Sequence, residues 1–327
     1  MRVFLTGANG LVGSHILDLL RASQVEVVIL LRRTSNTRFI EEHLPHVQVR
    51  YGSLEDDDVL REAVREVDCI IHCAGKTSVL KTAEFYRANR EGPRNVVRAA
   101  NAHKGSLRHL IHISSRAVFG PSTVVNAARE DDPSQPISDY GRSKLLGERE
   151  VTEHCEVPYT VLRPSAVYGP RDEAFLFAFQ VVQLRLMPAF TGRKQQINLV
   201  YARDVAEAVL RCLDRREAFG RVYNVASPEP CTTADLFEEI GRQMRVRPVP
   251  VPLPLAALYP VCVAREILSR ITRKPHILNR QKYAELSAPG WVCSSERIRQ
   301  ELGYVAHTSL QEGIARTLDW YRRNGWL

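Results

Sequence analysis

The chain has 327 residues, 44% hydrophobic and 25% charged, a composition typical of a globular protein with a full core. Its net charge is +8, but the basic residues are dispersed and no zinc-finger or RNA-binding signature occurs, so we expect no nucleic-acid partner. Seven cysteines without a C-x-x-C spacing argue against a metal site or disulfide framework and favour reduced thiols in a cytoplasmic protein.

Short apolar segments alternate with helical patterns in the first half of the chain. The apolar segments, interpreted as strands, are 3–5, 25–31, 47–51, 69–73, 107–113 and 159–162. Helical patterns fall between them, the clearest at 54–67, 83–102 and 140–153. Because parallel strands need helical crossovers, this alternation predicts an α/β fold with a doubly wound parallel sheet of the Rossmann type.

The regular alternation of strand and helix patterns ends after Pro164, where prolines and irregular segments become frequent. We expect residues 1–170 to form a dinucleotide-binding domain, with a return to the sheet near 199–225. Residues 171–198 and 226–327 then form a smaller C-terminal substrate lobe. For the apolar run at 175–187, we favour helix packing over an apolar substrate pocket.

The proline-rich stretch 248–260 is open to two interpretations. We favour a surface connection followed by a short helix. The alternative is an apolar patch that touches a membrane or covers the substrate, so peripheral membrane contact is the less favoured prediction. No run of about 18 apolar residues predicts a membrane-spanning helix, and the N-terminus does not resemble a signal peptide.

A glycine-rich turn follows the first predicted strand and opens a helix. It reads Thr6-Gly7-Ala8-Asn9-Gly10-Leu11-Val12-Gly13. In this context Gly7 permits a tight turn, Gly10 lets backbone approach a pyrophosphate, and Gly13 lets the helix pack closely on the strand. The free N–H groups of the helix N-terminus favour phosphate, so we expect Gly7, Asn9, Gly10, Leu11 and Val12 to hold a dinucleotide.

The end of the second strand predicts which dinucleotide binds. An Asp or Glu there would bind the ribose 2′-hydroxyl of NAD, but this strand ends in Leu31-Arg32-Arg33. Guanidinium groups suit a 2′-phosphate, so we expect Arg32 and Arg33 to favour NADP, with NAD as the other possibility. The alternative is that both arginines are simply solvated.

Two further segments supply candidate catalytic residues. Tyr140 and Lys144 form a Y-x-x-x-K pair, which a helix places on one face. A neighbouring ammonium stabilises phenolate, so we expect Lys144 to lower the pKa of Tyr140 and make it an acid/base. Ser115 follows the strand that ends at Ile113 and would orient a substrate oxygen. The alternatives are a surface Tyr–Lys pair and a serine in local turn hydrogen bonds.

Together these segments resemble the extended short-chain dehydrogenase/reductases, the NAD-dependent epimerase/dehydratase family, over nearly the whole chain. TGANGLVG, IIHCAGKTS, ANREGPRNV, ISSRAVFG, YGRSK and RPSAVYGP each match a family segment. The resemblance implies a homodimer through helices near 83–102 and 140–153. It also implies a cofactor lined by Ser53, Leu54, Ala74, Gly75, Lys76, Asn89, Tyr140, Lys144, Pro164 and Val167.

The chain also departs from the family pattern. Gly52-Ser53-Leu54 lacks the common Asp, and Ile197 stands where nucleotide-sugar epimerases carry an Arg, with Arg193 and Lys194 nearby. The pattern is more similar to the 3β-hydroxysteroid dehydrogenase and dihydroflavonol reductase branches. We therefore expect an enzyme that interconverts a ketone and a secondary alcohol on a lipophilic small molecule. The alternatives are a nucleotide-sugar epimerase or dehydratase with retained NAD, and a dinucleotide-sensing regulator.

Overall fold

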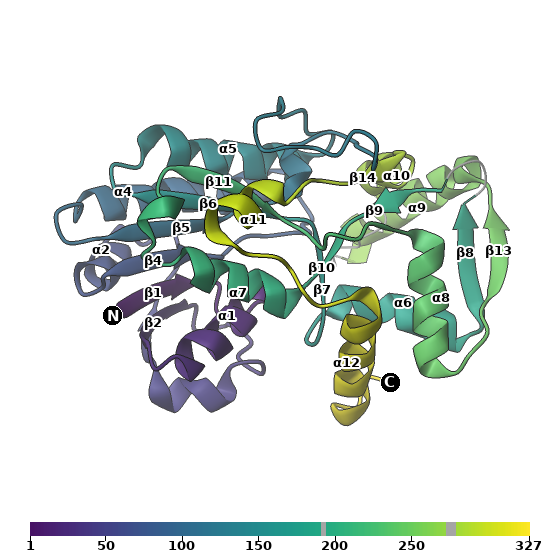
Figure 1. Ribbon diagram of the computed structural model, residues 1–327, viewed down its shortest axis with the longest axis horizontal. Coiled ribbons are helices and arrows are strands. Elements are labelled where there is room, and N and C mark those ends of the chain that lie inside the picture. The colour runs from purple at the N-terminus through teal and green to yellow at the C-terminus, as the bar shows by residue number, and fades with distance from the viewer. Residues whose placement is uncertain (191–193, 273–278) are drawn as a thin grey trace.

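A seven-stranded parallel sheet forms the centre of the protein, which we describe from a computed structural model covering residues 1–190, 194–272 and 279–327 (Figure 1). The strand order is β11-β6-β5-β4-β1-β2-β3, and each neighbouring pair is parallel. This confirms the predicted doubly wound α/β fold. The strands are β1 (Arg2–Thr6), β2 (Glu26–Leu31), β3 (Gln48–Tyr51), β4 (Cys69–His72), β5 (His109–Ile113), β6 (Tyr159–Pro164) and β11 (Arg221–Val225).

Helices cover both faces of this sheet. Side chains alternate along each strand, so Leu5 and Ile71 face one helical layer while Phe4 and Ile70 face the other. The first layer contains α1 (Leu11–Ala22) and α7 (Ala202–Cys212). The second contains α2 (Asp57–Arg65), α4 (Gly92–Asn101) and α5 (Asp139–His154). The helix predicted at 83–102 is α3 (Ala83–Tyr86), a π-helical turn η2 (Arg87–Glu91) and α4 in succession.

The strand order reverses between β1 and β4, which is where ligands bind in open sheets of this kind. The carboxyl ends of β1, β4, β5 and β6 lie side by side at this edge because the strands are parallel. Thr6, His72, Ile113 and Pro164 are the last residues of these strands. The segments that follow them contain most of the predicted site residues.

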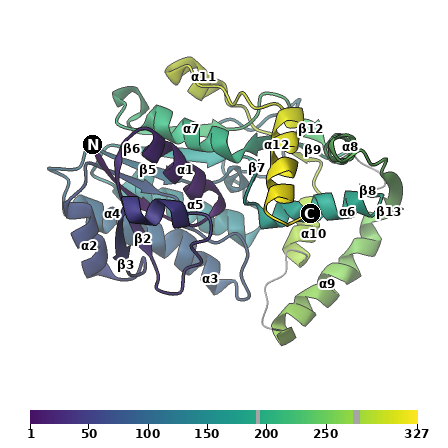
Figure 2. The same ribbon diagram turned by 90° about the horizontal axis from the view of Figure 1, so that it is seen from below.

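A second group of elements lies beyond the sheet (Figures 1 and 2). Its core contains Tyr168, Phe179, Ile240 and Tyr321. The elements of the chain not yet named are η1 (Glu41–His46), η3 (Arg116–Val118), β7 (Ala166–Tyr168), α6 (Glu173–Gln183), β8 (Leu186–Phe190), β9 (Gln196–Ile197), β10 (Leu199–Tyr201), η4 (Arg216–Ala218), β12 (Cys231–Thr232), α8 (Thr233–Met244), β13 (Val249–Leu253), α9 (Leu255–Thr272), α10 (Arg280–Leu286), β14 (Gly290–Trp291), α11 (Glu296–Leu302) and α12 (Leu310–Arg323).

The proline-rich stretch differs from the favoured prediction. It forms the strand β13 and enters α9 (Leu255–Thr272), an 18-residue helix with Pro260 inside it, so the expected short helix is wrong. The apolar run at 175–187, for which helix packing and a substrate pocket were the two interpretations, lies largely in α6. Within this helix Phe179 is fully buried in the core, whereas Phe177 is 63% exposed. No helix in the described ranges is both long and apolar enough to cross a membrane.

Helix α5 approaches the neighbouring helical segment very closely at Gly147. A Cβ atom at this position would lie 1.8 Å from the carbonyl oxygen of Asn89, so only glycine fits without a backbone shift. This contact fixes the depth of α5, and therefore the position of the two predicted site residues at its start, Tyr140 and Lys144.

We therefore predict that Gly147→Ala lowers the free energy of unfolding by at least about 2 kcal/mol, because overpacking outweighs the helix propensity gained. Urea denaturation measures the effect. Arg149→Ala, at an exposed position of the same helix, is the matched control and should change stability by only about 0.5 kcal/mol. Equal stability of the two variants would contradict the close contact.

Candidate active site

The glycine-rich turn has the geometry that a dinucleotide requires. Gly7 has a φ of +74°, and a Cβ there would lie 2.6 Å from the backbone nitrogen of Ala74. A Cβ on Gly13 would lie 2.0 Å from the carbonyl oxygen of Gly7, so helix and turn are in contact. Gly10 precedes α1 and provides no side-chain cap, which leaves the first N–H groups of the helix available to a phosphate.

The other predicted residues of this turn lie beside the helix N-terminus. Leu11 and Val12 begin α1 and are partly buried. The side-chain amide of Asn9 donates to the carbonyl oxygen of Asn36 at 3.1 Å, which ties the turn to the loop after β2. These contacts fit a dinucleotide whose pyrophosphate lies at the start of α1.

Arg32 and Arg33 are exposed directly after β2, and neither forms an ion pair with another described residue. The guanidinium of Arg33 lies 5.1 Å from the ring centre of Tyr51, at the end of β3. The hydroxyl of Ser53, two residues further on, accepts from the backbone of Glu55. Guanidinium groups without an ion pair to another described residue fit the predicted 2′-phosphate at this strand end. Leu54 follows Ser53 in the same loop.

The loop after β4 is anchored by Asn89. Its side-chain oxygen accepts from the backbone nitrogen of Lys76 at 2.8 Å, and its amide donates to the hydroxyl of Ser143 in α5 at 3.0 Å. A Cβ on Gly75 would lie 2.9 Å from that same oxygen of Asn89 and 3.7 Å from the Nζ of Lys144. The loop that touches the glycine turn therefore also lies against the amine of Lys144.

Tyr140, Lys144 and Ser115 are brought together at this edge of the sheet. The hydroxyl of Ser115 is close enough to Tyr140 to lower the pKa of its phenol. The Nζ of Lys144 is buried and donates to the carbonyl oxygen of Ile113 at 2.7 Å. Lys144 is buried, so it does not form the surface pair of the alternative interpretation. The local turn hydrogen bond expected of the serine is present, since the hydroxyl of Ser115 accepts from the backbone nitrogen of Ala117 at 3.2 Å.

The expected effect of Lys144 on Tyr140 is wrong. Burial raises the pKa of Tyr140 above its ordinary value, and the hydroxyl of Ser115 offsets this only in part. Burial also lowers the pKa of Lys144 to about 8. Because its pKa is raised, Tyr140 is a protonated phenol at neutral pH. The ammonium of Lys144 donates to the carbonyl oxygen of Ile113.

Pro164 and Val167 lie on two strands of different sheets, β6 and β7. Pro164 ends β6 and is paired with Val225 of β11. Val167 belongs to β7, where it is paired with Val200 of β10 and is partly buried against the core. Of the two, only Pro164 lies on a strand of the central sheet that is paired with β5.

A buried ion pair holds α5 to the sheet, and sequence reasoning missed it. The guanidinium of Arg163 in β6 donates to both carboxylate oxygens of Glu148, one helical turn after Lys144. Arg163 also donates to the carbonyl oxygen of Glu130 and lies over the ring of Phe119. The R-P-x-x-V-Y-G-P segment drew attention to Arg163 in the sequence. Nothing in the sequence indicated that Glu148 is its partner.

Helix α10 (Arg280–Leu286) contacts the start of α5, which the sequence also did not predict. The side-chain oxygen of Gln281 accepts from the backbone nitrogen of Asp139 at 2.7 Å, and its amide donates to the Asp139 carboxylate at 2.5 Å. On the other side, the ring of Phe85 lies 5.9 Å from that of Tyr140. Tyr140 is therefore bordered by an aromatic ring and by a helix of the lobe.

A pair of buried histidines lies near Lys144. His72 and His112 are paired across β4 and β5, with ring centres 5.3 Å apart. Burial lowers the pKa of His72 to about 3 and that of His112 well below its usual value, and the nearby Lys144 adds to both shifts. Both rings are neutral at physiological pH, so Lys144 is the cation of this cluster.

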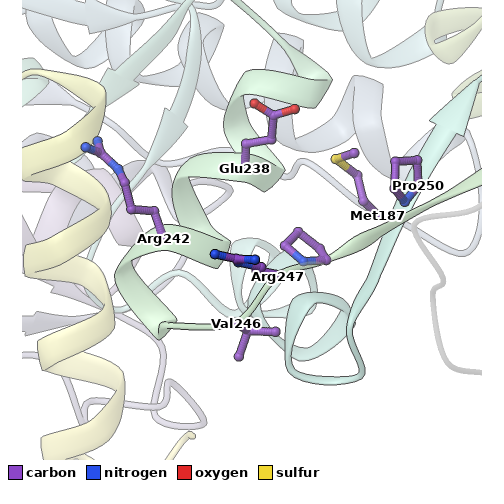
Figure 3. A pocket seen from close by; sticks show the side chains of 7 residues that line it. Met187, Glu238, Arg242, Val246, Arg247 and Pro250 are labelled. Carbon is purple, nitrogen blue, oxygen red and sulfur yellow. The ribbon is translucent and has the colours of Figure 1, made fainter.

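Two surface hollows in the described part of the protein lie elsewhere. One, of about 420 Å³, is formed by α8 and β13 and includes Met187, Arg247 and Pro250 (Figure 3). The other lies beside α7 and includes Tyr304. Neither contains a predicted site residue. Of the basic residues near Ile197, Lys194 is exposed, whereas Arg193 lies outside the described residues.

Comparison with known proteins agrees with the sequence motifs. The sequence profile of the NAD dependent epimerase/dehydratase family matches residues 3–226. Ceramide reductase of Caulobacter vibrioides is 26% identical, with 99% of this chain and 96% of that protein covered. N-acetyl-alpha-D-glucosaminyl-diphospho-ditrans,octacis-undecaprenol 4-epimerase of Escherichia coli O157:H7 is 25% identical, over 97% of this chain and 94% of its own.

Solved structures share the same architecture. The crystal structure of gox2253 is 27% identical, with a TM-score of 0.81 over 99% of this chain and 98% of its own. MoeE5 in complex with UDP-glucuronic acid and NAD is 21% identical, with a TM-score of 0.77 over 99% and 100% of the two chains. At that identity the second match supports the fold alone.

We predict that Arg163→Met lowers the free energy of unfolding by about 3–5 kcal/mol, because it leaves the carboxylate of Glu148 buried and unpaired. Urea denaturation again provides the measurement. Replacing both residues, Arg163→Met with Glu148→Met, should cost less than the single change. Arg316→Met, which breaks an exposed ion pair with Glu312, is the control and should cost at most about 1 kcal/mol. A loss from Arg163→Met no larger than the control's would contradict the anchoring role.

Proposed function

The chain belongs to the NAD dependent epimerase/dehydratase family, and on that basis we propose that it is an NAD(P)-dependent oxidoreductase that interconverts a ketone and a secondary alcohol. The single observation that carries this proposal is the cluster of Ser115, Tyr140 and Lys144 next to the glycine-rich turn. A bound nicotinamide dinucleotide supplies or accepts the hydride in such a reaction.

In the reductive direction, the residues of this chain have distinct tasks. Tyr140 donates its phenolic proton to the carbonyl oxygen of the substrate as that oxygen gains negative charge. The raised pKa of Tyr140 supports this direction, because a protonated phenol is the form that an acid needs. Ser115 orients the same oxygen, and the ammonium of Lys144 would hold the ribose of a bound cofactor.

Two observations favour a lipophilic substrate. Ile197 occupies the position where the epimerases of the resemblance carry a phosphate-binding Arg. Two relatives have names that refer to lipophilic molecules. One is ceramide reductase, and the other is a ketoreductase of a farnesyl dihydroquinoline oxide from Stigmatella aurantiaca, 25% identical over 96% of this chain and 95% of its own. We propose a ketone with a large apolar part.

A nucleotide-sugar epimerase or dehydratase with retained NAD is the alternative, supported by the likeness to the undecaprenol-linked 4-epimerase. It predicts that NAD copurifies with the protein and that no NADPH is consumed in net turnover. The sequence after β2 does not favour an enzyme with retained NAD, because Arg32 and Arg33 occupy the positions where an acidic residue would bind the NAD ribose. A cytoplasmic location fits the seven unpaired cysteines, and a homodimer through α4 and α5 is proposed from the family resemblance alone.

We predict that Tyr140→Phe lowers kcat for NADPH-dependent ketone reduction by about 10²–10⁴-fold, because the proton donor is lost. The dissociation constant of NADPH, measured by fluorescence titration, should stay nearly unchanged. Tyr86→Phe removes a nearby phenol that donates to Asp139 and serves as the matched control with near-normal turnover. Full activity of Tyr140→Phe on a ketone that the parent protein reduces would refute the assignment.

We predict that replacing Arg32 and Arg33 together by Ala weakens NADPH binding by about 10–100-fold, since charged hydrogen bonds to a 2′-phosphate contribute about 1.5–3 kcal/mol. NADH binding should be unaffected because NADH lacks that phosphate. Arg61→Ala combined with Arg94→Ala, at exposed positions of α2 and α4, controls for the loss of two charges. Equal losses for the two cofactors, or a parent protein that prefers NADH, would overturn the choice of NADP.

A further inference from the structure

The exposed side of helix α9 is apolar. Pro260, Ala264, Ile267, Leu268 and Ile271 follow an i, i+4, i+7, i+8, i+11 spacing, and this set is the apolar face of α9. All five are exposed, with Ile271 74%, Ile267 54% and Leu268 45% accessible. A surface helix of a globular protein normally shows the opposite pattern, with its apolar stripe turned to the core.

The inner side of α9 is occupied by α10. The rings of Tyr259 and Tyr283 meet edge to face with centres 5.1 Å apart, and Arg280 of α10 forms a 2.9 Å ion pair with Glu266. Figure 2 shows α9 projecting beyond the rest of the lobe with α10 beside it. Both contacts lie on the side of α9 that meets α10, whereas the apolar face is exposed to solvent.

The sequence around this helix is strongly basic. Residues 255–286 contain six Lys or Arg and two Glu, a formal charge of +4, which is half of the net +8 of the whole chain. Arg245 and Arg247, just before β13, are exposed and form no ion pair with another described residue. An apolar helical face in basic surroundings has the chemistry that binds an anionic lipid surface.

We propose that α9 lies on the surface of an anionic lipid bilayer, with its apolar face at the level of the upper acyl chains. Arg245, Arg247 and Arg265, which are exposed, are attracted to the lipid phosphates. Because Gln281 of α10 bonds Asp139, the residue before Tyr140, the bilayer-bound helix is one helix away from the candidate active site. A lipophilic substrate then reaches the site from the membrane, although vesicle binding itself needs no turnover.

The test is flotation of the full-length protein with vesicles of phosphatidylcholine, prepared with and without phosphatidylglycerol. The parent protein should bind the anionic vesicles, and added salt should weaken binding. Ile267→Asp combined with Ile271→Asp should weaken it about tenfold or more, because two exposed apolar side chains no longer enter the bilayer. Val124→Asp with Val125→Asp, at exposed apolar positions of 50% and 90% accessibility, makes the same change in charge and should bind as the parent does.

Thermal unfolding and NADPH titration establish that both double variants are folded. No binding of the parent protein, equal binding to neutral and anionic vesicles, or undiminished binding of the α9 variant would each overturn the proposal. Light scattering adds one more decisive outcome. A parent dimer that the α9 variant alone converts to a monomer would assign the apolar face to a second copy of the chain instead. None of these results depends on whether the protein reduces a ketone.

Discussion

Helix α5 is held against the parallel sheet by buried cations, and the geometry of the candidate active site depends on this attachment. Lys144 bonds the carbonyl of Ile113 at the end of β5, while Arg163 of β6 bonds Glu148 one turn further along the helix. Gly147 lets the opposite side of the helix touch the backbone of Asn89. A buried cation without its partner is costly, so these contacts leave α5 little freedom to slide or rotate.

Burial also determines which groups carry protons at this edge of the sheet. It raises the pKa of Tyr140 and lowers that of Lys144 to about 8, while His72 and His112 stay neutral below them. The cluster therefore combines one neutral phenol with one ammonium. That combination suits proton donation to an oxygen that becomes negative, and it explains why the phenol need not be ionised beforehand.

Local sequence signals predicted the sheet, the glycine turn and the grouping of Ser115, Tyr140 and Lys144, because strand alternation and turn chemistry act over a few residues. Contacts between distant segments were not predictable: Gln281 bonds Asp139 across 142 positions. The error about the pKa of Tyr140 has the same origin, since spacing reveals the neighbour but not the burial. The length of α9 was missed because prolines usually interrupt helices, whereas Pro260 lies inside this one.

Helix α10 contacts the residue before Tyr140, and the apolar face of the neighbouring helix α9 is exposed. A small-molecule ketone would have to place its oxygen between Ser115 and Tyr140. The most direct test is a crystal structure with NADP and an unreactive analogue of a reduced ketone. We expect the ligand oxygen at about 2.5–3.0 Å from both hydroxyls. A ligand oxygen bound away from Tyr140 would contradict it.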